Sequence, residues 1–158
     1  EGVMEARADV TTDSREQLLA EAYCLRAFVH FDLINLYAKW YDPATAATDK
    51  AVPLSLKIDI GQSFIPTTVE KVYEQVFADL QEAEKYMQVE QQTGAYLYRF
   101  SKKALKAFQA RVYLYHQDWK QAQETAESLL AACPLPKPNL GLIRRKKRYL
   151  LWKRYPVP

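Results

Sequence analysis

Apolar residues recur at helical spacing in four segments of the chain. The first segment covers residues 14–41, where apolar side chains follow one another at steps of three or four residues, the period of one helix face. The positions in this stripe are Leu18, Ala22, Leu25, Val29, Leu33, Leu36 and Trp40. Because Cys24, Phe28 and Phe31 widen the stripe, we expect this helix to be buried on most sides.

Three further helices are predicted at about 68–89, 102–116 and 119–132. The spacing predicts these inward positions: Val69, Val72, Val76, Leu80, Ala83 and Met87; Ala104, Leu105, Phe108, Val112 and Tyr115; Ala122, Ala126, Leu129 and Cys133. Each of the four helices is preceded by a residue whose side-chain oxygen can accept an exposed N–H of the first turn. These expected N-caps are Ser14, Thr67, Ser101 and Asp118.

The connections between the segments differ in length, and this predicts the fold. Asp42-Pro43 should end the first helix, and residues 42–66 contain three prolines and a glycine without a helical period. A loop this long inside a small domain is usually functional. The last two helices are joined by about two residues, which forces an antiparallel αα-hairpin.

Small and aromatic residues in that hairpin fall near the positions typical of a tetratricopeptide repeat, although Gln109 replaces an expected apolar residue. The matching positions are Ala110, Tyr113, Ala122 and Pro134. We therefore predict an all-α fold of antiparallel, tetratricopeptide-like helical hairpins, with a long loop after the first helix.

Composition and charge divide the chain into two parts. With 158 residues, 49% of them apolar and 26% charged, the chain is typical of one folded domain. Residues 134–158 hold eight basic residues and no acidic one, so residues 1–133 carry a net charge of −5 although the whole chain carries +3. We predict a helical domain over 1–133 and an irregular basic tail over 134–158, in which Tyr149–Trp152 could form a short strand.

Four blocks of sequence follow one another in an order that is specific as a set. They are Glu21–Tyr37 (EAYCLRA, FDL and LY), Val52–Leu54 (VPL), Thr68–Glu84 (TVEKVY, DL and AE) and Arg99–Ala122 (RFSKKA, ARVYLY and DWKQA). In this order, over about residues 14–135, the blocks resemble the SusD/RagB family of outer-membrane nutrient-binding lipoproteins. The chain departs from the family's pattern in lacking an N-terminal lipobox cysteine, in being short, and in the basic run Arg144–Arg148. We expect a fragment, a truncated gene or a shifted reading frame.

The resemblance implies a fold and a function. Family members are all-helical proteins whose tetratricopeptide-like hairpins support a large glycan-binding portion. They are lipid-anchored at the cell surface, lie as a lid on a TonB-dependent outer-membrane transporter, and capture oligosaccharides or other nutrients without catalysis. The resemblance thus implies a sugar ligand, a transporter partner, an outer-membrane location, and membrane contact only through a lipid anchor that this sequence does not contain.

The sequence contains little that indicates a catalytic or metal-binding site. His30 and His116 are the only histidines and neither belongs to a metal-ligand spacing, so we interpret His30 as a packed, hydrogen-bonded residue. Cys24 and Cys133 fall on predicted inward faces, where free cysteines behave as small apolar residues. A disulfide between these two cysteines is the alternative. No glycine-rich phosphate loop is present, and we expect no cofactor, no metal and no enzyme activity.

Candidate ligand-binding residues are aromatic side chains in or beside loops, because sugars stack on flat rings. Trp40, Tyr41 and Asp42 lie where the first helix opens into the long loop, and Tyr96 and Tyr98 lie in the next connection. The alternative is that Trp40 continues the packed stripe of the helix.

Two other kinds of partner are compatible with parts of the sequence. A tetratricopeptide-type adaptor for protein–protein interaction is the alternative function. The basic tail with Tyr149, Trp152 and Tyr155 could neutralise phosphates and stack bases, but a solvated run explains it as well, and we do not expect nucleic acid.

Overall fold

A computed structural model describes residues 14–57, 61 and 64–133. These described residues contain four α-helices: α2 (Arg15–Tyr37), α3 (Val69–Tyr86), α4 (Lys102–Tyr115) and α5 (Trp119–Ala132). A short 3-10 helix, η1 (Gly94–Tyr96), lies between α3 and α4. The described residues form no strand beyond an isolated antiparallel bridge between Lys50 and Thr68. The predicted all-α fold is therefore confirmed, while the basic tail lies outside the described residues.

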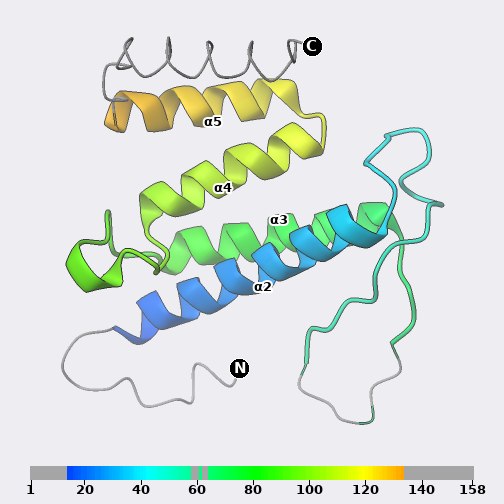
Figure 1. Ribbon diagram of the computed structural model, residues 1–158, viewed down its shortest axis with the longest axis horizontal. Helices are drawn as coiled ribbons and strands as arrows, with labels where there is room; N and C mark the ends of the chain where they lie inside the picture. Colours follow the sequence, from blue (N-terminus) through cyan, green and yellow to red (C-terminus); the bar gives the residue numbers. More distant parts are fainter. Residues whose placement is uncertain (1–13, 58–60, 62–63, 134–158) are drawn as a thin grey trace, which may run out of the picture.

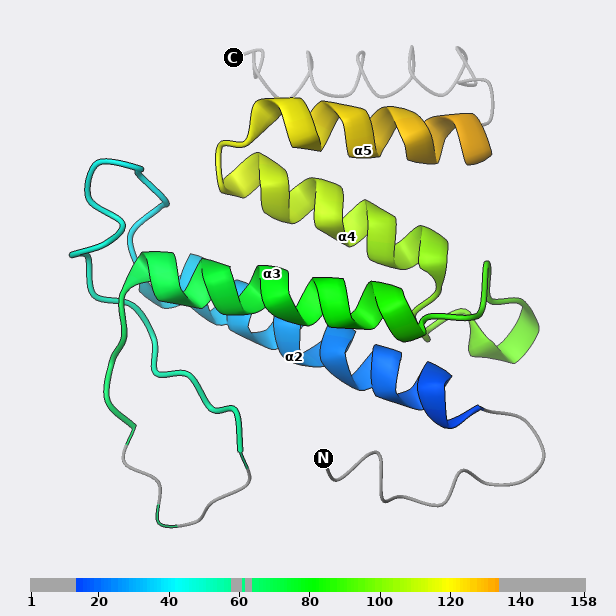
Figure 2. The same ribbon diagram turned by 180° about the vertical axis from the view of Figure 1, so that it is seen from behind.

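The helices form two antiparallel hairpins that stack on each other (Figures 1 and 2). α2 packs on α3, α4 packs on α5, and α3 contacts α4 between the two hairpins. The loop that joins α2 to α3 first runs past the common end of these helices, as the cyan segment of Figure 1 shows, and then returns to α2 near Ser55. None of the helices in the described part is long and apolar enough to cross a membrane.

The core lies where α2, α3 and α4 meet, and α3 supplies its most regular face. All six predicted inward residues between Val69 and Met87 are buried. α4 adds Leu105, Phe108 and Val112. The Phe31 ring of α2 packs edge-on against Phe108, with 5.5 Å between ring centres. Aromatic pairs at this separation and angle add to the stabilisation from area burial alone.

The predicted inward face of α2 is correct at Cys24 and Phe31, which are buried, and wrong for most of the aliphatic stripe. Leu25, Val29 and Leu36 are 56%, 46% and 73% exposed. Four further residues, which the spacing did not place inward, also face the core: Gln17, Ala20, Ala27 and Ile34. α2 is apolar on two faces, and the face rich in small residues packs on α3 because small side chains let two helices approach closely. The larger aliphatic side chains are left on an outer face, and α2 is not buried on most sides.

The helix ends agree with the predictions in part. The Ser14 hydroxyl accepts the Gln17 N–H at 3.1 Å, and Ser101 caps α4 in the same way. The cap of α3 is Thr68 rather than Thr67, and the Asp118 side chain makes no cap hydrogen bond. α2 ends at Tyr37, four residues before the predicted end, because Ala38 is extended.

Two inward positions near the ends of α4 and α5 are also corrected. Tyr115 is 50% exposed. Cys133 is exposed because it follows the last turn of α5, a helix that buries only Ala122 among its residues. Both Cys24 and Cys133 are free, and Cys24 is buried as predicted.

Candidate functional site

The predicted long loop after α2 is present, and it begins with an ordered turn. The Asp42 carboxylate accepts the Ala44 N–H at 2.9 Å, and its carbonyl accepts the N–H groups of Thr45 and Ala46 at 3.0 and 2.8 Å. Asp49 pairs with Lys39 and accepts the Thr45 hydroxyl at 2.7 Å. The hydrogen bond from Lys39, with that from Thr45, holds the pKa of the Asp49 carboxyl below its usual range. Asp42 therefore stabilises the turn with one of its two carboxylate oxygens.

Tyr41 anchors this segment to the helical body. Its ring lies 4.0 Å from the His116 ring and 5.1 Å from the Tyr73 ring, centre to centre. Its carbonyl accepts a hydrogen bond from Gln117 Nε2 at 2.6 Å. Burial raises the pKa of Tyr41, and nearby Glu70 raises it further. Tyr41 is thus a packing residue, whose ring contacts His116 and Tyr73.

Trp40 has the opposite environment. Its side chain is 85% exposed, so the alternative that it continues the packed stripe of α2 is wrong. Because its neighbour Tyr41 is anchored, the exposed indole is carried by a fixed stretch of backbone. A flat ring presented in this way can stack on the apolar face of a ligand, and its N–H can donate a hydrogen bond.

Tyr96 and Tyr98 lie beside the other end of α2. They are 46% and 81% exposed. Together with Phe100 they line a groove of about 570 Å³ whose opposite wall includes Leu18 and Leu25 of α2. The Arg99 Nε atom pairs with Glu21 across the groove at 3.0 Å, and its guanidinium lies 5.9 Å from the Tyr96 ring centre. This groove combines exposed rings with a fixed charged pair.

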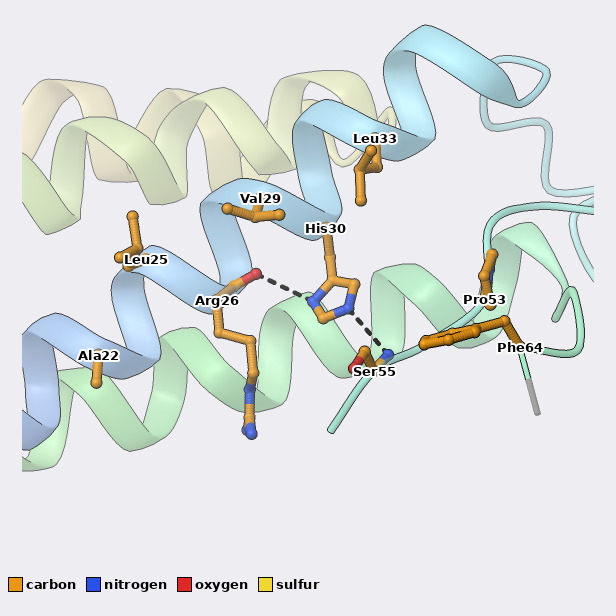
Figure 3. Close-up of a pocket in the computed structure, with 9 residues that line it drawn as sticks. All are labelled: Ala22, Leu25, Arg26, Val29, His30, Leu33, Pro53, Ser55 and Phe64. Carbon is orange, nitrogen blue, oxygen red and sulfur yellow. Dashed lines mark hydrogen bonds between the residues drawn. The ribbon is translucent and has the colours of Figure 1, made fainter. Parts of the chain in front are cut away.

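A second groove continues along the outer face of α2 and shares Ala22 and Leu25 with the first. Its volume is about 470 Å³, and Figure 3 shows the residues that line it: Ala22, Leu25, Arg26, Val29, His30, Leu33, Pro53, Ser55 and Phe64. Most of this lining is apolar. The sequence pattern did not predict this groove, because it placed the aliphatic residues of α2 in the core. The sequence did contain a signal for the groove: α2 has apolar residues on two faces, and only one of them can pack on α3.

His30 closes the floor of the second groove. The Ser55 N–H points to Nε2 at 3.4 Å, so Nδ1 carries the proton and donates it to the Arg26 carbonyl at 3.0 Å. His30 is 5% exposed, which confirms its interpretation as a packed, hydrogen-bonded histidine. These two bonds join the loop segment at Ser55 to α2 and satisfy both ring nitrogens.

The structure does not bring the five candidate residues together. α2 has 23 residues and is therefore about 35 Å long. Tyr96 and Tyr98 share a groove with its N-terminal half, whereas Trp40 to Asp42 follow its C-terminal end. Within the described ranges there is no group of three metal-ligating side chains. Burial raises the pKa of the Cys24 thiol to about 12, so this thiol is not an activated nucleophile.

A family model for SusD-like proteins, described as starch-binding and associating with the outer membrane, matches residues 3–114. The chain belongs to the SusD-like family. SusD-like protein P38 of Formosa agariphila is 32% identical over 120 residues, which is 73% of this chain and 21% of that protein. The resemblance found in the sequence is therefore confirmed.

Solved structures of the family share the helical fold. A SusD superfamily protein from Bacteroides vulgatus is 28% identical, with a TM-score of 0.66 over 75% of this chain and 26% of its own. A SusD-like protein described as laminarin-binding is 27% identical, with a TM-score of 0.59 over 77% of this chain and 25% of its own. The SusD-like chain described here thus spans about a quarter of the length of these relatives.

Proposed function

We propose that the chain is the helical part of a surface nutrient-binding protein, which captures oligosaccharides without catalysis and delivers them to a TonB-dependent outer-membrane transporter. Membership of a family described as starch-binding and outer-membrane-associated supports the sugar ligand and the location. A lipid anchor outside this sequence would hold the protein to the membrane. The observation that carries the proposal is the 85% exposed Trp40 ring on an anchored turn.

In this proposal Trp40 is a platform for a sugar ring. Apolar C–H faces of the sugar stack on the indole, and hydroxyl groups bind the second carboxylate oxygen of Asp42. Tyr41 acts indirectly, because its contacts with Tyr73 and His116 hold the platform in place. Tyr96 and Tyr98 form a second aromatic surface about one helix length away, beside the Arg99–Glu21 pair.

The helices themselves serve as a scaffold. The outer face of α2, with Leu25, Val29 and Leu36 exposed, offers an apolar surface for further polypeptide to pack on. The chain covers about a quarter of its solved relatives, so a SusD-like protein has much additional polypeptide to support. The hairpins would also provide the surface that docks onto the transporter.

Glycan titration tests the ligand-binding part of the proposal. Laminarin and starch oligosaccharides are titrated into the protein and binding is followed by calorimetry. Trp40→Ala should weaken binding about tenfold or more, which is about 1.4 kcal/mol. Trp119→Ala is the matched control, because Trp119 is 61% exposed on α5 and belongs to no candidate sugar site. Equal affinities of the two variants, or no binding by the unchanged protein, would contradict the proposal.

The adaptor function has one observation in its favour. A groove of about 450 Å³ runs between α4 and α5, lined by Ala110, Leu114, Trp119, Ala122 and Ala126 among others. Grooves of this kind accept an amphipathic helix or peptide. The Trp119→Ala control separates the two functions, because it should weaken peptide capture and leave glycan binding unchanged.

A further inference from the structure

His116 lies where three parts of the chain meet. It follows α4, and its backbone N–H donates to the Val112 carbonyl at 2.9 Å. Its ring packs against Tyr41 at 4.0 Å, against Phe77 at 5.0 Å and nearly perpendicular, and against Tyr73 at 5.3 Å. Tyr73 and Phe77 belong to α3, so one imidazole joins α3 and the segment after α2 to the end of α4.

One nitrogen of this ring has no partner. Nδ1 of His116 is buried and makes no hydrogen bond within the described part of the chain. In a neutral imidazole one nitrogen carries no proton, and burying this uncharged ring costs less than burying a charged one. Protonation turns both nitrogens into donors, and a buried donor without an acceptor costs its full desolvation. The surroundings of His116 therefore accept its neutral form and oppose its charged form.

The charges around the ring decide how strong this preference is. Asp118 favours protonation, as does the C-terminal end of α4. From the other side, Tyr41 and Tyr73 face the ring as neutral phenols, because burial raises the pKa of both, that of Tyr73 to about 12. Phe77 carries no charge, and Glu70 and Glu74 act on Tyr41. Burial outweighs Asp118 and lowers the pKa of His116 below its ordinary value of 6.5.

We propose that His116 is a pH-sensitive latch, which holds the Trp40–Asp42 segment against α3 and α4 while neutral and loosens it when protonated. The second hold on the segment is adjacent in sequence: Gln117, in the left-handed region at φ 65°, donates to the Tyr41 carbonyl. A shift of His116 therefore disturbs two contacts of Tyr41 together, the ring contact with His116 and the hydrogen bond from Gln117, and leaves only the contact with Tyr73. The effect on sugar capture by Trp40 rests on the proposed function; the latch itself does not.

The direction of the pH dependence follows from the lowered pKa. A group whose pKa is lower in the folded state contributes its full stabilisation above its unfolded pKa. That stabilisation is lost as the pH falls from 6.5 through the lower value of the folded state. The segment is thus held at neutral pH and loosened in acid.

Proton NMR on the unchanged chain tests the latch. The protein has two histidines, so two imidazole Cε1–H signals are expected, and His116→Phe identifies the one from His116. We expect that signal to titrate with a midpoint below 6.5, and the backbone amides of Trp40 and Tyr41 to shift with the same midpoint. In Asp118→Asn the midpoint should fall further, because the favourable charge is gone.

Two results would overturn the latch. One is a His116 midpoint at or above 6.5, the ordinary value. The other is a set of Trp40 and Tyr41 amides that stay unchanged while His116 titrates. Both are measured on the unchanged protein, so a variant that fails to fold does not affect the outcome. Absence of glycan binding would contradict the proposed function alone, since the titration contains no sugar.

Discussion

Arg26 of α2 and Asp79 of α3 form an ion pair that joins the two helices. Two parallel hydrogen bonds connect them: Arg26 Nε donates to Asp79 Oδ2 at 2.8 Å, and Nη2 donates to Oδ1 at 2.6 Å. Gln75 Nε2 adds a third bond to Oδ1 at 2.8 Å. The two partners differ in environment, because the Asp79 side chain is 2% exposed and that of Arg26 is 33% exposed.

This asymmetry predicts unequal effects of removing either partner. Arg26→Met leaves a buried carboxylate that keeps the hydrogen bond from Gln75 but loses its cation, and breaking a buried pair in this way costs about 3–5 kcal/mol. Asp79→Leu leaves a guanidinium that is one third exposed and can turn to water. Its cost should be about 2 kcal/mol, the size of lost hydrogen bonds to a charged group. Arg26→Met should therefore be the more destabilising change.

Combining both substitutions should recover much of the loss. Replacing a whole buried pair by apolar residues of similar volume is often neutral, because no unpaired charge remains. The free energy of unfolding is measured from urea denaturation followed by circular dichroism in the far ultraviolet. The exposed pair between Lys85 and Glu82 is the control, and Glu82→Ala should leave the urea midpoint unchanged.

Two outcomes would refute this prediction. In the first, Asp79→Leu proves as destabilising as Arg26→Met. In the second, the double variant loses the sum of the two single effects. Either result would mean that burial of the carboxylate is not what makes the pair sensitive.

Three other outcomes are expected. Gln17→Leu should lower the free energy of unfolding by about 2 kcal/mol in urea denaturation, because the buried Gln17 Oε1 accepts two backbone N–H groups after α3, at 2.9 and 3.1 Å; a change under about 0.5 kcal/mol would contradict this. Leu25→Ser should leave the midpoint of thermal unfolding within about 2 °C of the unchanged protein, since Leu25 is already 56% exposed. A large decrease in this midpoint would mean that the outer face of α2 is buried. Cys133 should react with a thiol reagent in the folded protein under mildly alkaline conditions. The buried Cys24, whose pKa is raised to about 12, should react only on unfolding, and equal rates for the two thiols in the folded protein would count against its burial.

The helical part of the fold could be predicted where local sequence gives one answer. α3 has one apolar face and one polar face, so its five predicted inward residues and its C-cap Met87 are all buried as the spacing predicts. The short link before Trp119 leaves α4 and α5 no arrangement other than a hairpin, and the observed helices agree with it to within a residue. These features depend on neighbours that are close in the sequence.

The orientation of α2 could not be predicted in this way. Its sequence is apolar on two faces, and periodicity reports which positions share a face without saying which face meets α3. Small residues such as Ala20 and Ala27 made the close contact with α3 favourable, and Leu25 was left outside. The burial of the polar residue Gln17 could not be predicted either, because its hydrogen-bond partners Gln88 and Val89 lie 71 and 72 residues away in the sequence.

The candidate ligand-binding residues also differ in how far the sequence alone predicts their environment. The residue types at Trp40, Tyr96 and Tyr98 marked them as ring surfaces from sequence alone, and all three are exposed. Tyr41 had the same residue type and a similar position, yet it is an anchor because Tyr73 and His116 lie against it.

By itself the sequence determined the family, the helices and the caps at Ser14 and Ser101, because repeat spacing, motif order and capping chemistry are local properties. Only the tertiary structure decided which face of α2 is buried, which loop aromatics are free, and that His116 carries a buried nitrogen without a partner among the described residues. Those outcomes depend on contacts between residues such as Tyr41, Tyr73 and His116, which are far apart in the chain. No local pattern specifies such contacts, since they result from how the whole set of helices minimises its exposed apolar surface and its unpaired polar groups.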